Sequence, residues 1–325
     1  MGGAANRPIA PMLATLGAPP LGADERWAAE FKWDGCRIVA STCGDAPVLW
    51  SRSGSSVGQS YPEVVEALDS AVGSRQAILD GELVVLDTEG RPSFGLLQAR
   101  MNVTKPTTAL RRRVAVTFYA FDLLSLGGVD LTAAPYLDRR AALADLDLAG
   151  PRLKVPPHWV GIDSETMLDV ARQHSLEGVV FKKVASIYLP GTRSKSWIKT
   201  VLRRRASALI LGWVASGAQR NVVGSLILGV YDDAGELVPI GQVGTGLSAV
   251  MRRRLRDLLA PLARTTSPLA ASSPYVADPW IRWTEAEVVV DVDFREFTGG
   301  GLRHPSFKGI REDVPPRDVR RSSLQ

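Results

Sequence analysis

A lysine precedes a turn in the segment Glu30-Phe31-Lys32-Trp33-Asp34-Gly35-Cys36-Arg37. An Asp-Gly pair favours a tight turn between two strands. Lys32 is therefore expected at the end of a strand, where it could be held rigidly over a pocket. A lysine is a nucleophile only after its ammonium group has lost a proton, which burial and neighbouring cations favour. Taken alone, the segment more often indicates a surface lysine before a hairpin turn.

Four other short segments place charged side chains beside glycines or on apolar strands. Ser51-Arg52-Ser53-Gly54 offers an arginine and hydroxyls in a loop suited to a phosphate. Asp80-Gly81-Glu82 and Glu177-Gly178-Val179-Val180-Phe181-Lys182 each put a carboxylate at the start of an apolar strand, and the second adds a lysine. Ser196-Trp197-Ile198-Lys199 puts one more lysine on a strand. Each segment alone fits a turn or a solvated face, but their order and spacing together indicate chemistry.

The elements around these segments predict a mixed α+β domain over residues 1–202. Runs rich in β-branched and aromatic residues predict strands over 27–33, 37–42, 77–87, 114–124, 178–184 and 196–201. Apolar spacing predicts helices over 62–72 and 166–175. Residues 1–23 are rich in Pro, Gly and Ala and are expected to be irregular.

Residues 203–325 predict a second domain. Strands are expected over 206–214, 224–232 and 237–244, followed by a helix that Ser248 caps and Pro261 ends. Two further strands are expected over 287–297 and 306–313. Three strands, a helix and two strands are the order of an OB-fold β-barrel. The final six residues are expected to be disordered.

Composition narrows the class of protein. The chain has 325 residues, of which 45% are hydrophobic and 22% charged, and a formal net charge of +5. No apolar run reaches the roughly 18 residues that span a bilayer, and two cysteines exclude a disulfide framework and a Cys-rich zinc site. These features predict a soluble, cytoplasmic protein. Residues 201–325 hold 17 basic and 13 acidic side chains, which favours a polyanionic partner.

The ordered set of segments resembles the nucleotidyltransferase motifs of ATP-dependent DNA ligases, which are related to mRNA capping enzymes. The resemblance covers about residues 8–320 and includes a Phe-Asp-Leu strand and a last motif in the second domain. The matching segments are Lys32 to Arg37, Ser51 to Gly54, Asp80 to Glu82, Phe121 to Leu123, Glu177 to Lys182, Trp197 to Lys199 and Arg311 to Asp313. The size resembles minimal two-domain bacterial ligases, most closely the C-type ligases of mycobacteria.

This resemblance implies a nucleotidyltransferase (adenylation) domain of antiparallel sheets and helices, followed by the OB-fold. It implies that Lys32 attacks the α-phosphate of ATP and carries AMP, that Glu30 recognises adenine, and that Phe121 stacks on the base. Strand alternation puts Tyr119 on the same face as Phe121 and makes it the alternative. The implied catalytic residues are Lys32, Asp34, Arg37, Lys182 and Lys199. The implied contacts to ATP or AMP are Glu30, Lys32, Arg37, Arg52, Glu82, Phe121, Glu177, Lys182, Lys199, Arg311 and Asp313.

The resemblance also implies a metal and a nucleic-acid partner. Glu82 and Glu177 offer hard oxygen ligands for Mg²⁺ or Mn²⁺. Nicked duplex DNA is the implied partner, and a separate primase-polymerase repair protein is a second candidate. The arginines expected to contact DNA are Arg37, Arg52, Arg203, Arg204, Arg252 and Arg256.

Two positions depart from the family pattern, because Val201 and Val314 stand where lysines are usual. These departures motivate a competing hypothesis, a non-catalytic nucleic-acid-binding protein that has kept the ligase fold. A GTP-using capping guanylyltransferase or an RNA ligase is the alternative among enzymes.

Overall fold

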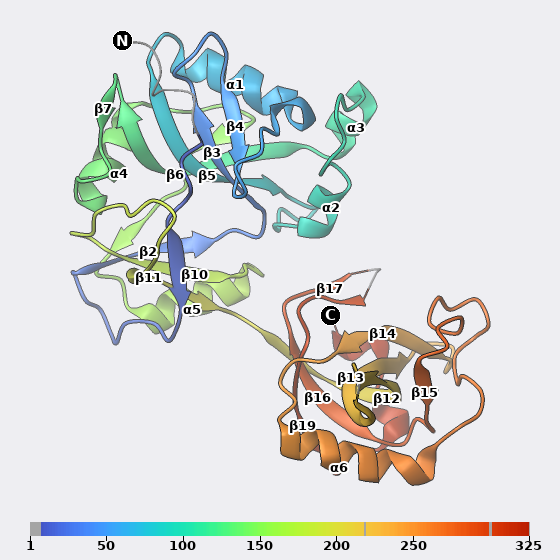
Figure 1. Cartoon of the computed structure of the whole chain (residues 1–325). Helices are drawn as coiled ribbons and strands as arrows, with labels where there is room; N and C mark the ends of the chain where they lie inside the picture. The colour runs from blue at the N-terminus through green and yellow to red at the C-terminus, as the bar shows by residue number, and fades with distance from the viewer. Residues whose placement is uncertain (1–7, 218, 299–300, 325) are drawn as a thin grey trace. The chain divides into compact units, whose positions relative to one another are not determined.

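A computed structural model describes residues 8–217, 219–298 and 301–324. The chain forms two compact units that divide between Leu202 and Arg203. Figure 1 shows the N-terminal unit in blue to yellow and the C-terminal unit in yellow to red. Each unit is described separately below.

The N-terminal unit contains two β-sheets. In the first, the strand order is β1-β11-β10-β2-β9, and in the second it is β4-β3-β5-β6-β7, with β8 beside β6. The pairs β1–β11 and β6–β8 are parallel. The strands are β1 (Leu13–Leu16), β2 (Trp27–Lys32), β3 (Cys36–Ser41), β4 (Val48–Ser51), β5 (Ala77–Val85), β6 (Val116–Leu126), β7 (Val129–Asp130), β8 (Leu153–Lys154), β9 (Trp159–Val160), β10 (Gly178–Lys183) and β11 (Arg193–Val201).

Helices bury one face of each sheet. On the second sheet, Val64 and Leu68 of α1 pack in one apolar cluster with Leu79 of β5 and Phe118 of β6. On the first sheet, Met167 of α5 joins a cluster with residues of β2 and β10. The helices are α1 (Pro62–Val72), α2 (Phe94–Gln98), α3 (Thr108–Arg113), α4 (Tyr136–Asp145) and α5 (Ser164–Gln173), and α1 and α5 lie against separate sheets in Figure 1. The charged motif side chains therefore lie on strand faces that α1 and α5 leave uncovered.

A bulge in β6 changes which side chains face the motif strands. Asp80 pairs with Asp122, but the next residue, Gly81, pairs with Ala120, so Phe121 is the extra residue of β6. A bulge breaks strand alternation locally. Ala120 and Leu123 both lie in the cluster under α1, whereas Phe121 and Asp122 lie outside it.

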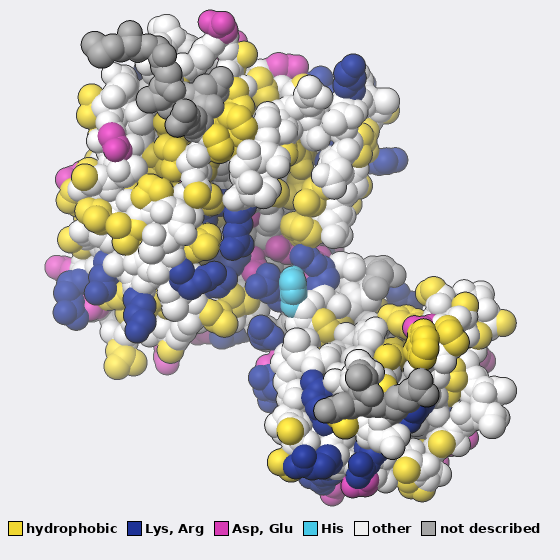
Figure 2. Space-filling view, in the orientation of Figure 1, with side chains coloured by type: hydrophobic (Ala, Val, Ile, Leu, Met, Phe, Trp, Pro, Cys, Tyr) yellow, Lys and Arg dark blue, Asp and Glu magenta, His cyan; other side chains and the backbone are white. Residues whose placement is uncertain are grey.

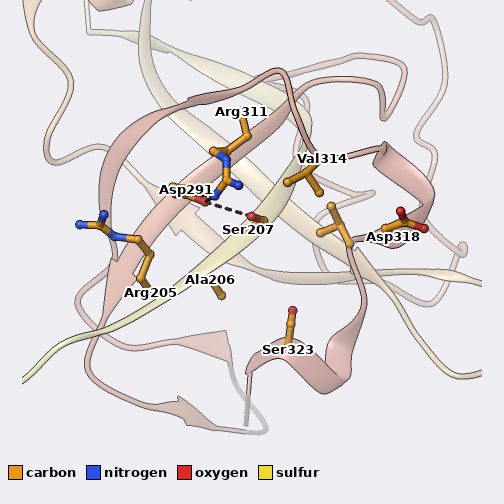
Figure 3. A pocket seen from close by; sticks show the side chains of 9 residues that line it. Arg205, Ala206, Ser207, Asp291, Arg311, Val314, Asp318 and Ser323 are labelled. Atoms are coloured by element: carbon orange, nitrogen blue, oxygen red, sulfur yellow. Dashed lines mark hydrogen bonds and ion pairs between the residues drawn. The ribbon is translucent and has the colours of Figure 1, made fainter.

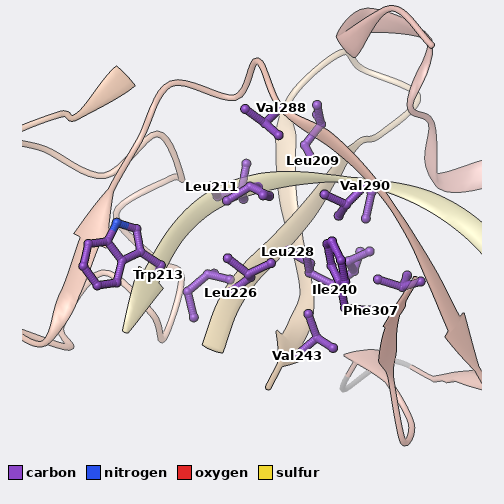
Figure 4. Packing of buried hydrophobic residues seen from close by; sticks show 14 of the residues in the cluster. Leu209, Leu211, Trp213, Leu226, Leu228, Ile240, Val243, Val288, Val290 and Phe307 are labelled. Carbon is purple, nitrogen blue, oxygen red and sulfur yellow. The ribbon is translucent and has the colours of Figure 1, made fainter. Parts of the chain in front are cut away.

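The C-terminal unit is an OB-fold, as the sequence predicts. Its main sheet has the order β14-β13-β12-β16-β19, and β15 also pairs with β12. Figure 4 shows apolar side chains such as Leu209, Leu228 and Val290 gathered between these strands. The elements are β12 (Arg204–Ser216), β13 (Gln219–Tyr231), β14 (Leu237–Val243), α6 (Ala249–Leu259), β15 (Ile281–Trp283), β16 (Val289–Phe294), β17 (Phe297–Thr298), β18 (Gly301–Leu302) and β19 (Ser306–Arg311).

Two expectations about the chain ends differ from the structure. Residues 13–16, expected to be irregular, form β1, because pairing with β11 supplies backbone hydrogen bonds that their own sequence does not signal. At the other end, Arg321–Leu324 forms a 3₁₀-helix rather than a disordered tail. Leu324 is fully buried in the core of the C-terminal unit, which anchors this turn. Within residues 8–217, 219–298 and 301–324, no helix is long and apolar enough to cross a membrane.

Candidate active site

Lys32 lies at the end of β2, as its sequence context predicts. It pairs in register with Gly178 of β10, which brings the preceding residue, Glu177, alongside. Lys32 Nζ forms an ion pair with Glu177 Oε2. The side chain of Glu177 is 4% exposed and that of Lys32 22% exposed, so the lysine remains accessible from one side.

Two motif glycines allow the strands to approach this closely. A Cβ added at Gly35 would lie 2.1 Å from the carbonyl oxygen of Leu83 in β5. Gly178 has φ +148°, and a Cβ there would lie 2.1 Å from the carbonyl oxygen of Thr200 in β11. A side chain at Gly35 would push the turn after Lys32 away from β5, which carries Glu82, and one at Gly178 would push β10 away from β11, which carries Lys199.

Arg37 is fixed by a buried carboxylate. Its Nε and Nη2 atoms donate to the two carboxylate oxygens of Asp80 at 2.5 and 2.6 Å. The hydroxyl of Tyr188 also donates to Asp80, at 2.6 Å, and accepts from the backbone N–H of Met12 at 2.9 Å. Burial acts to lower the pKa of Arg37, but the charge and hydrogen bonds of Asp80 outweigh it and raise that pKa.

A second buried network surrounds Glu30. Lys182 Nζ lies 2.7 Å from Glu30 Oε2, and the Tyr136 hydroxyl donates to Glu30 Oε1 at 2.5 Å. Lys182 Nζ also lies 4.6 Å from the ring centroid of Phe121. Burial acts to raise the pKa of Glu30, but the charges of Lys182 and Arg140 and the hydrogen bonds from Lys182 and Tyr136 outweigh burial and lower that pKa. Glu30 is therefore an ionised carboxylate inside the protein.

The two aromatic candidates for base stacking lie in different surroundings. The Phe121 ring has the Arg37 guanidinium 4.5 Å from its centroid in addition to Lys182. The Tyr119 ring packs edge-on against Trp33, with centroids 4.6 Å apart. The contacts of Arg37 and Lys182 with the Phe121 ring are cation–π contacts.

Glu82 lies directly opposite Arg37 on neighbouring strands. Burial raises the pKa of Glu82 to about 7, and the charges of Lys32 and Arg37 only partly oppose this, while Glu177 raises it further. The negative charge of Glu177 thus acts on Glu82. Among the residues that the structure describes, no group of three or more His, Cys, Asp or Glu side chains is arranged to hold a metal ion.

The remaining predicted residues of this unit lie around that centre. Asp34 is half-buried in the turn between β2 and β3, and Lys199 lies on β11 opposite Val180. Arg52 is exposed in a tight turn in which the Gly54 N–H donates to the Ser51 carbonyl at 2.8 Å. Arg203 and Arg204 are exposed at the start of the C-terminal unit.

The last motif lines a pocket of about 430 Å³ in the C-terminal unit. Arg311 donates through Nη1 to Asp291 at 3.0 Å and through Nε and Nη2 to Asp313, both at 2.7 Å. In Figure 3 Arg311 and Ser207 converge on Asp291, and Val314 lies at the pocket wall. The guanidinium is therefore held by two carboxylates of its own unit.

Arg252 and Arg256 share helix α6 but have different partners. Arg252 donates to the carbonyl oxygens of Val223 and Gly224, both at 2.5 Å, and to that of Gly244 at 3.0 Å. Arg256 pairs with Asp257 at 2.6 Å. Figure 2 shows lysine and arginine side chains on the surfaces of both units.

The sequence did not reveal the partners that hold the motif residues. Asp80 was recognised only as part of a motif, and Tyr136 and Tyr188 were not singled out. Tyr136 is 106 residues from Glu30, and Tyr188 is 108 residues from Asp80. No local spacing signals contacts over such separations.

Comparisons with known proteins agree with this geometry. A family model described as the ATP dependent DNA ligase domain matches residues 11–200. A second, described as the ATP dependent DNA ligase C terminal region, matches residues 219–314.

Curated relatives and solved structures extend the match. The chain is 38% identical over 316 residues to the "Multifunctional non-homologous end joining protein LigD" of Mycolicibacterium smegmatis, covering 96% of this chain and 39% of that protein. It is 32% identical to a DNA ligase of Natronomonas pharaonis, and the match covers 96% of this chain and 57% of that protein. The chain thus spans about two fifths of the length of the LigD relative. Among solved structures, the ligase domain of M. tuberculosis LigD is 37% identical with a TM-score of 0.54, covering 96% of this chain and 97% of that one. A mycobacterial DNA ligase D complexed with ATP and MES is 38% identical with a TM-score of 0.56, at the same coverage.

Proposed function

The chain belongs to the ATP-dependent DNA ligases, and from this premise we propose that it seals nicks in duplex DNA through an AMP–lysine intermediate on Lys32. The observation that carries the proposal is the placement of Lys32. It ends β2, is partly exposed, and has its Nζ on Glu177, and its charge acts on Glu82, which pairs with Arg37 between β5 and β3 of the other sheet.

The proposed reaction has three steps. Lys32 Nζ attacks the α-phosphorus of ATP, so a P–N bond forms while the bond to pyrophosphate breaks. An oxygen of the 5′-phosphate at the nick then attacks the AMP phosphorus, which breaks the P–N bond and frees Lys32. Finally the 3′-hydroxyl loses its proton and attacks the 5′-phosphorus, so the phosphodiester bond forms as AMP leaves. In the free protein Glu177 Oε2 holds the Nζ atom of Lys32.

The residues around Lys32 divide the remaining tasks. Lys182 and Lys199 stabilise charge at the α-phosphate, since preorganised cations act most strongly where water is excluded. Arg37 is assigned to the 5′-phosphate at the nick, and Asp80, which accepts from its Nε and Nη2 atoms, fixes the orientation of the guanidinium group. Arg52 faces solvent and is assigned to the same phosphate.

Glu82 and Glu177 fit a divalent cation that substrate phosphates also bind. Mg²⁺ is usually held by one or two carboxylates together with substrate phosphates and water, and these two carboxylates interact electrostatically. When bound, Mg²⁺ or Mn²⁺ supplies neutralisation of the charge on the departing pyrophosphate. Titrating each metal into a self-adenylation assay on wild type and Glu82→Gln tests this assignment.

Arginines of the C-terminal unit complete the proposal. Arg311 and Asp313 are assigned to the pyrophosphate of ATP, which requires Arg311 to exchange at least one carboxylate partner for phosphate. Arg203, Arg204, Arg252 and Arg256 are assigned to the DNA backbone. For Arg252 this contact competes with three carbonyl bonds.

The finer biological role is also a proposal. We place the protein in cytoplasmic DNA repair and among the C-type ligases, with a separate primase-polymerase repair protein as partner. The names of the LigD relatives, which refer to non-homologous end joining, support a repair role. The mass of the polypeptide in cells tests the subtype, because a C-type ligase is a two-domain chain and LigD is much longer. Affinity capture with nicked DNA present tests the partner.

A sealing assay tests the proposed function. A nicked duplex with a labelled 5′-phosphate is incubated with ATP and Mg²⁺, and wild type should convert it to the sealed strand whereas Lys32→Ala should not. Parallel labelling with α-labelled ATP and GTP separates a ligase from a guanylyltransferase. DNA binding without any sealing or labelling would favour the non-catalytic alternative.

A further inference from the structure

Tyr136, which belongs to none of the motif segments, contacts the carboxylate of Glu30. It is the first residue of α4, its side chain is fully buried, and its hydroxyl lies 2.5 Å from Glu30 Oε1. The opposite oxygen, Oε2, lies 2.7 Å from Lys182 Nζ. Each oxygen of the carboxylate is thus held by a different buried group, Oε1 by the hydroxyl donor from α4 and Oε2 by an ion pair with the ammonium group from β10.

The two donors give the carboxylate one orientation and one charge state. Burial and the neighbouring Glu30 raise the pKa of Tyr136 well above its usual value, so its hydroxyl stays protonated and acts as a donor. An ionised carboxylate that only receives hydrogen bonds has no proton to give. It can therefore accept an N–H group from a ligand but opposes a carbonyl oxygen at the same place.

This difference discriminates between purine bases. Adenine carries an amino group at C6, and guanine carries a carbonyl oxygen there. Glu30 also lies in one cluster with Phe121, because Lys182 contacts both. An aromatic ring for the face of a base and a fixed acceptor for its edge are then provided by neighbouring residues.

We propose that Tyr136 is a positioning residue for nucleotide selection, which holds Glu30 as an oriented, ionised acceptor so that the pocket takes ATP and rejects GTP. The inference rests on the proposed function, in which Glu30 meets the adenine edge. Tyr136 acts through Glu30 and does not itself touch the nucleotide.

Tyr136→Phe isolates the hydroxyl. The phenylalanine keeps the ring, which lies 5.0 Å from Lys182 Nζ, and removes only the donor to Glu30. The assay is self-adenylation of the full chain with α-labelled ATP and α-labelled GTP, with kcat and KM determined for each. We expect the KM for ATP to rise by up to roughly 10- to 100-fold, the value of a whole hydrogen bond to a charged group, because the bond also exists in the free protein. The kcat should stay within about threefold, and the ATP/GTP ratio of kcat/KM should fall in parallel.

Tyr188→Phe is the matched control. It removes another buried tyrosine hydroxyl from the same unit, which donates to Asp80 at 2.6 Å. Because Asp80 holds Arg37 and not Glu30, this variant should leave the ATP/GTP ratio at the wild-type value. If buried hydroxyls had only a structural role, the ATP/GTP ratio would instead change in both variants alike.

The outcomes separate this inference from the proposed function. A Tyr136→Phe protein with the wild-type ATP/GTP ratio overturns the inference, while labelling of wild type by ATP still supports the ligase. Absence of labelling in wild type overturns the proposed function itself. Should Tyr136→Phe fail to fold, Glu30→Gln tests the acceptor on which the inference depends, because an amide can donate to a guanine carbonyl. An unchanged ratio in Glu30→Gln overturns the inference as well.

Discussion

Replacing Asp80 with leucine leaves Arg37 without its counter-charge inside the N-terminal unit. Asp80 is fully buried, and the pair is bidentate at 2.5 and 2.6 Å. Removing one partner of a buried ion pair costs about 3–5 kcal/mol, because the other charge stays buried and unpaired. For a unit of about 200 residues that cost lowers the melting temperature by roughly 6–20 °C. We expect Arg37→Met alone to be similarly destabilising, since Asp80 then keeps only the Tyr188 hydroxyl.

The double variant provides the decisive comparison. Replacing both partners with apolar side chains of similar size is often nearly neutral. Arg37→Met combined with Asp80→Leu should therefore cost at least about 2 kcal/mol less than the sum of the single variants. Urea unfolding followed by tryptophan fluorescence measures all three. Arg26→Met, at an ion pair whose arginine side chain is 85% exposed, is the control and should leave the transition unchanged. Additive single costs, or single costs under about 1 kcal/mol, would refute the reasoning.

Three further predictions concern charge, base stacking and DNA. Folding raises the pKa of Glu82 from 4.5 to about 7, so its contribution to the free energy of unfolding is complete below about pH 4.5 and is lost as the pH rises through 7. The wild type should therefore lose up to about 3 kcal/mol more stability over this pH range than Glu82→Gln. Identical dependence of the unfolding free energy on pH in the two proteins would contradict this prediction. Phe121→Ala should weaken ATP binding by about 1–3 kcal/mol and leave the affinity for nicked duplex unchanged; unchanged ATP affinity would assign stacking to Tyr119. Replacing both Arg252 and Arg256 with Gln should reduce the slope of log binding constant against log salt concentration by nearly 2 if both contact phosphate. The reduction should be about 0.9 if Arg252 keeps its hydrogen bonds to the backbone carbonyls. An unchanged slope would show that neither arginine contacts the DNA.

The sequence predicted the strands that carry the motifs because each motif is local. Lys32 precedes an Asp-Gly turn, and alternating or apolar runs flank it, so the end of β2 could be located from a few residues. The order of the OB-fold was equally visible, since its long strands β12 and β13 are strongly apolar. The three-residue β15 and the two-residue strands β17 and β18 are too short to leave a pattern.

The contacts that orient the site could not be predicted in this way. The bulge at Phe121 lets the side chains of Phe121 and Asp122 lie on the same side of β6, whereas strict alternation would put them on opposite sides. Tyr136 reaches Glu30 only because α4 packs against the strands, and Asp80 meets Arg37 through pairing of β3 with β5. These features depend on tertiary packing, which no window of neighbouring residues encodes.

Mass spectrometry of the intact and digested protein after incubation with ATP and Mg²⁺ tests the central claim most directly. We predict one AMP per chain, attached to Lys32, and no AMP on the Lys32→Ala variant treated in the same way. Addition of nicked duplex with a 5′-phosphate should then remove the AMP from Lys32 as the nick is sealed. AMP on another lysine, or none on the wild-type protein, would contradict the account.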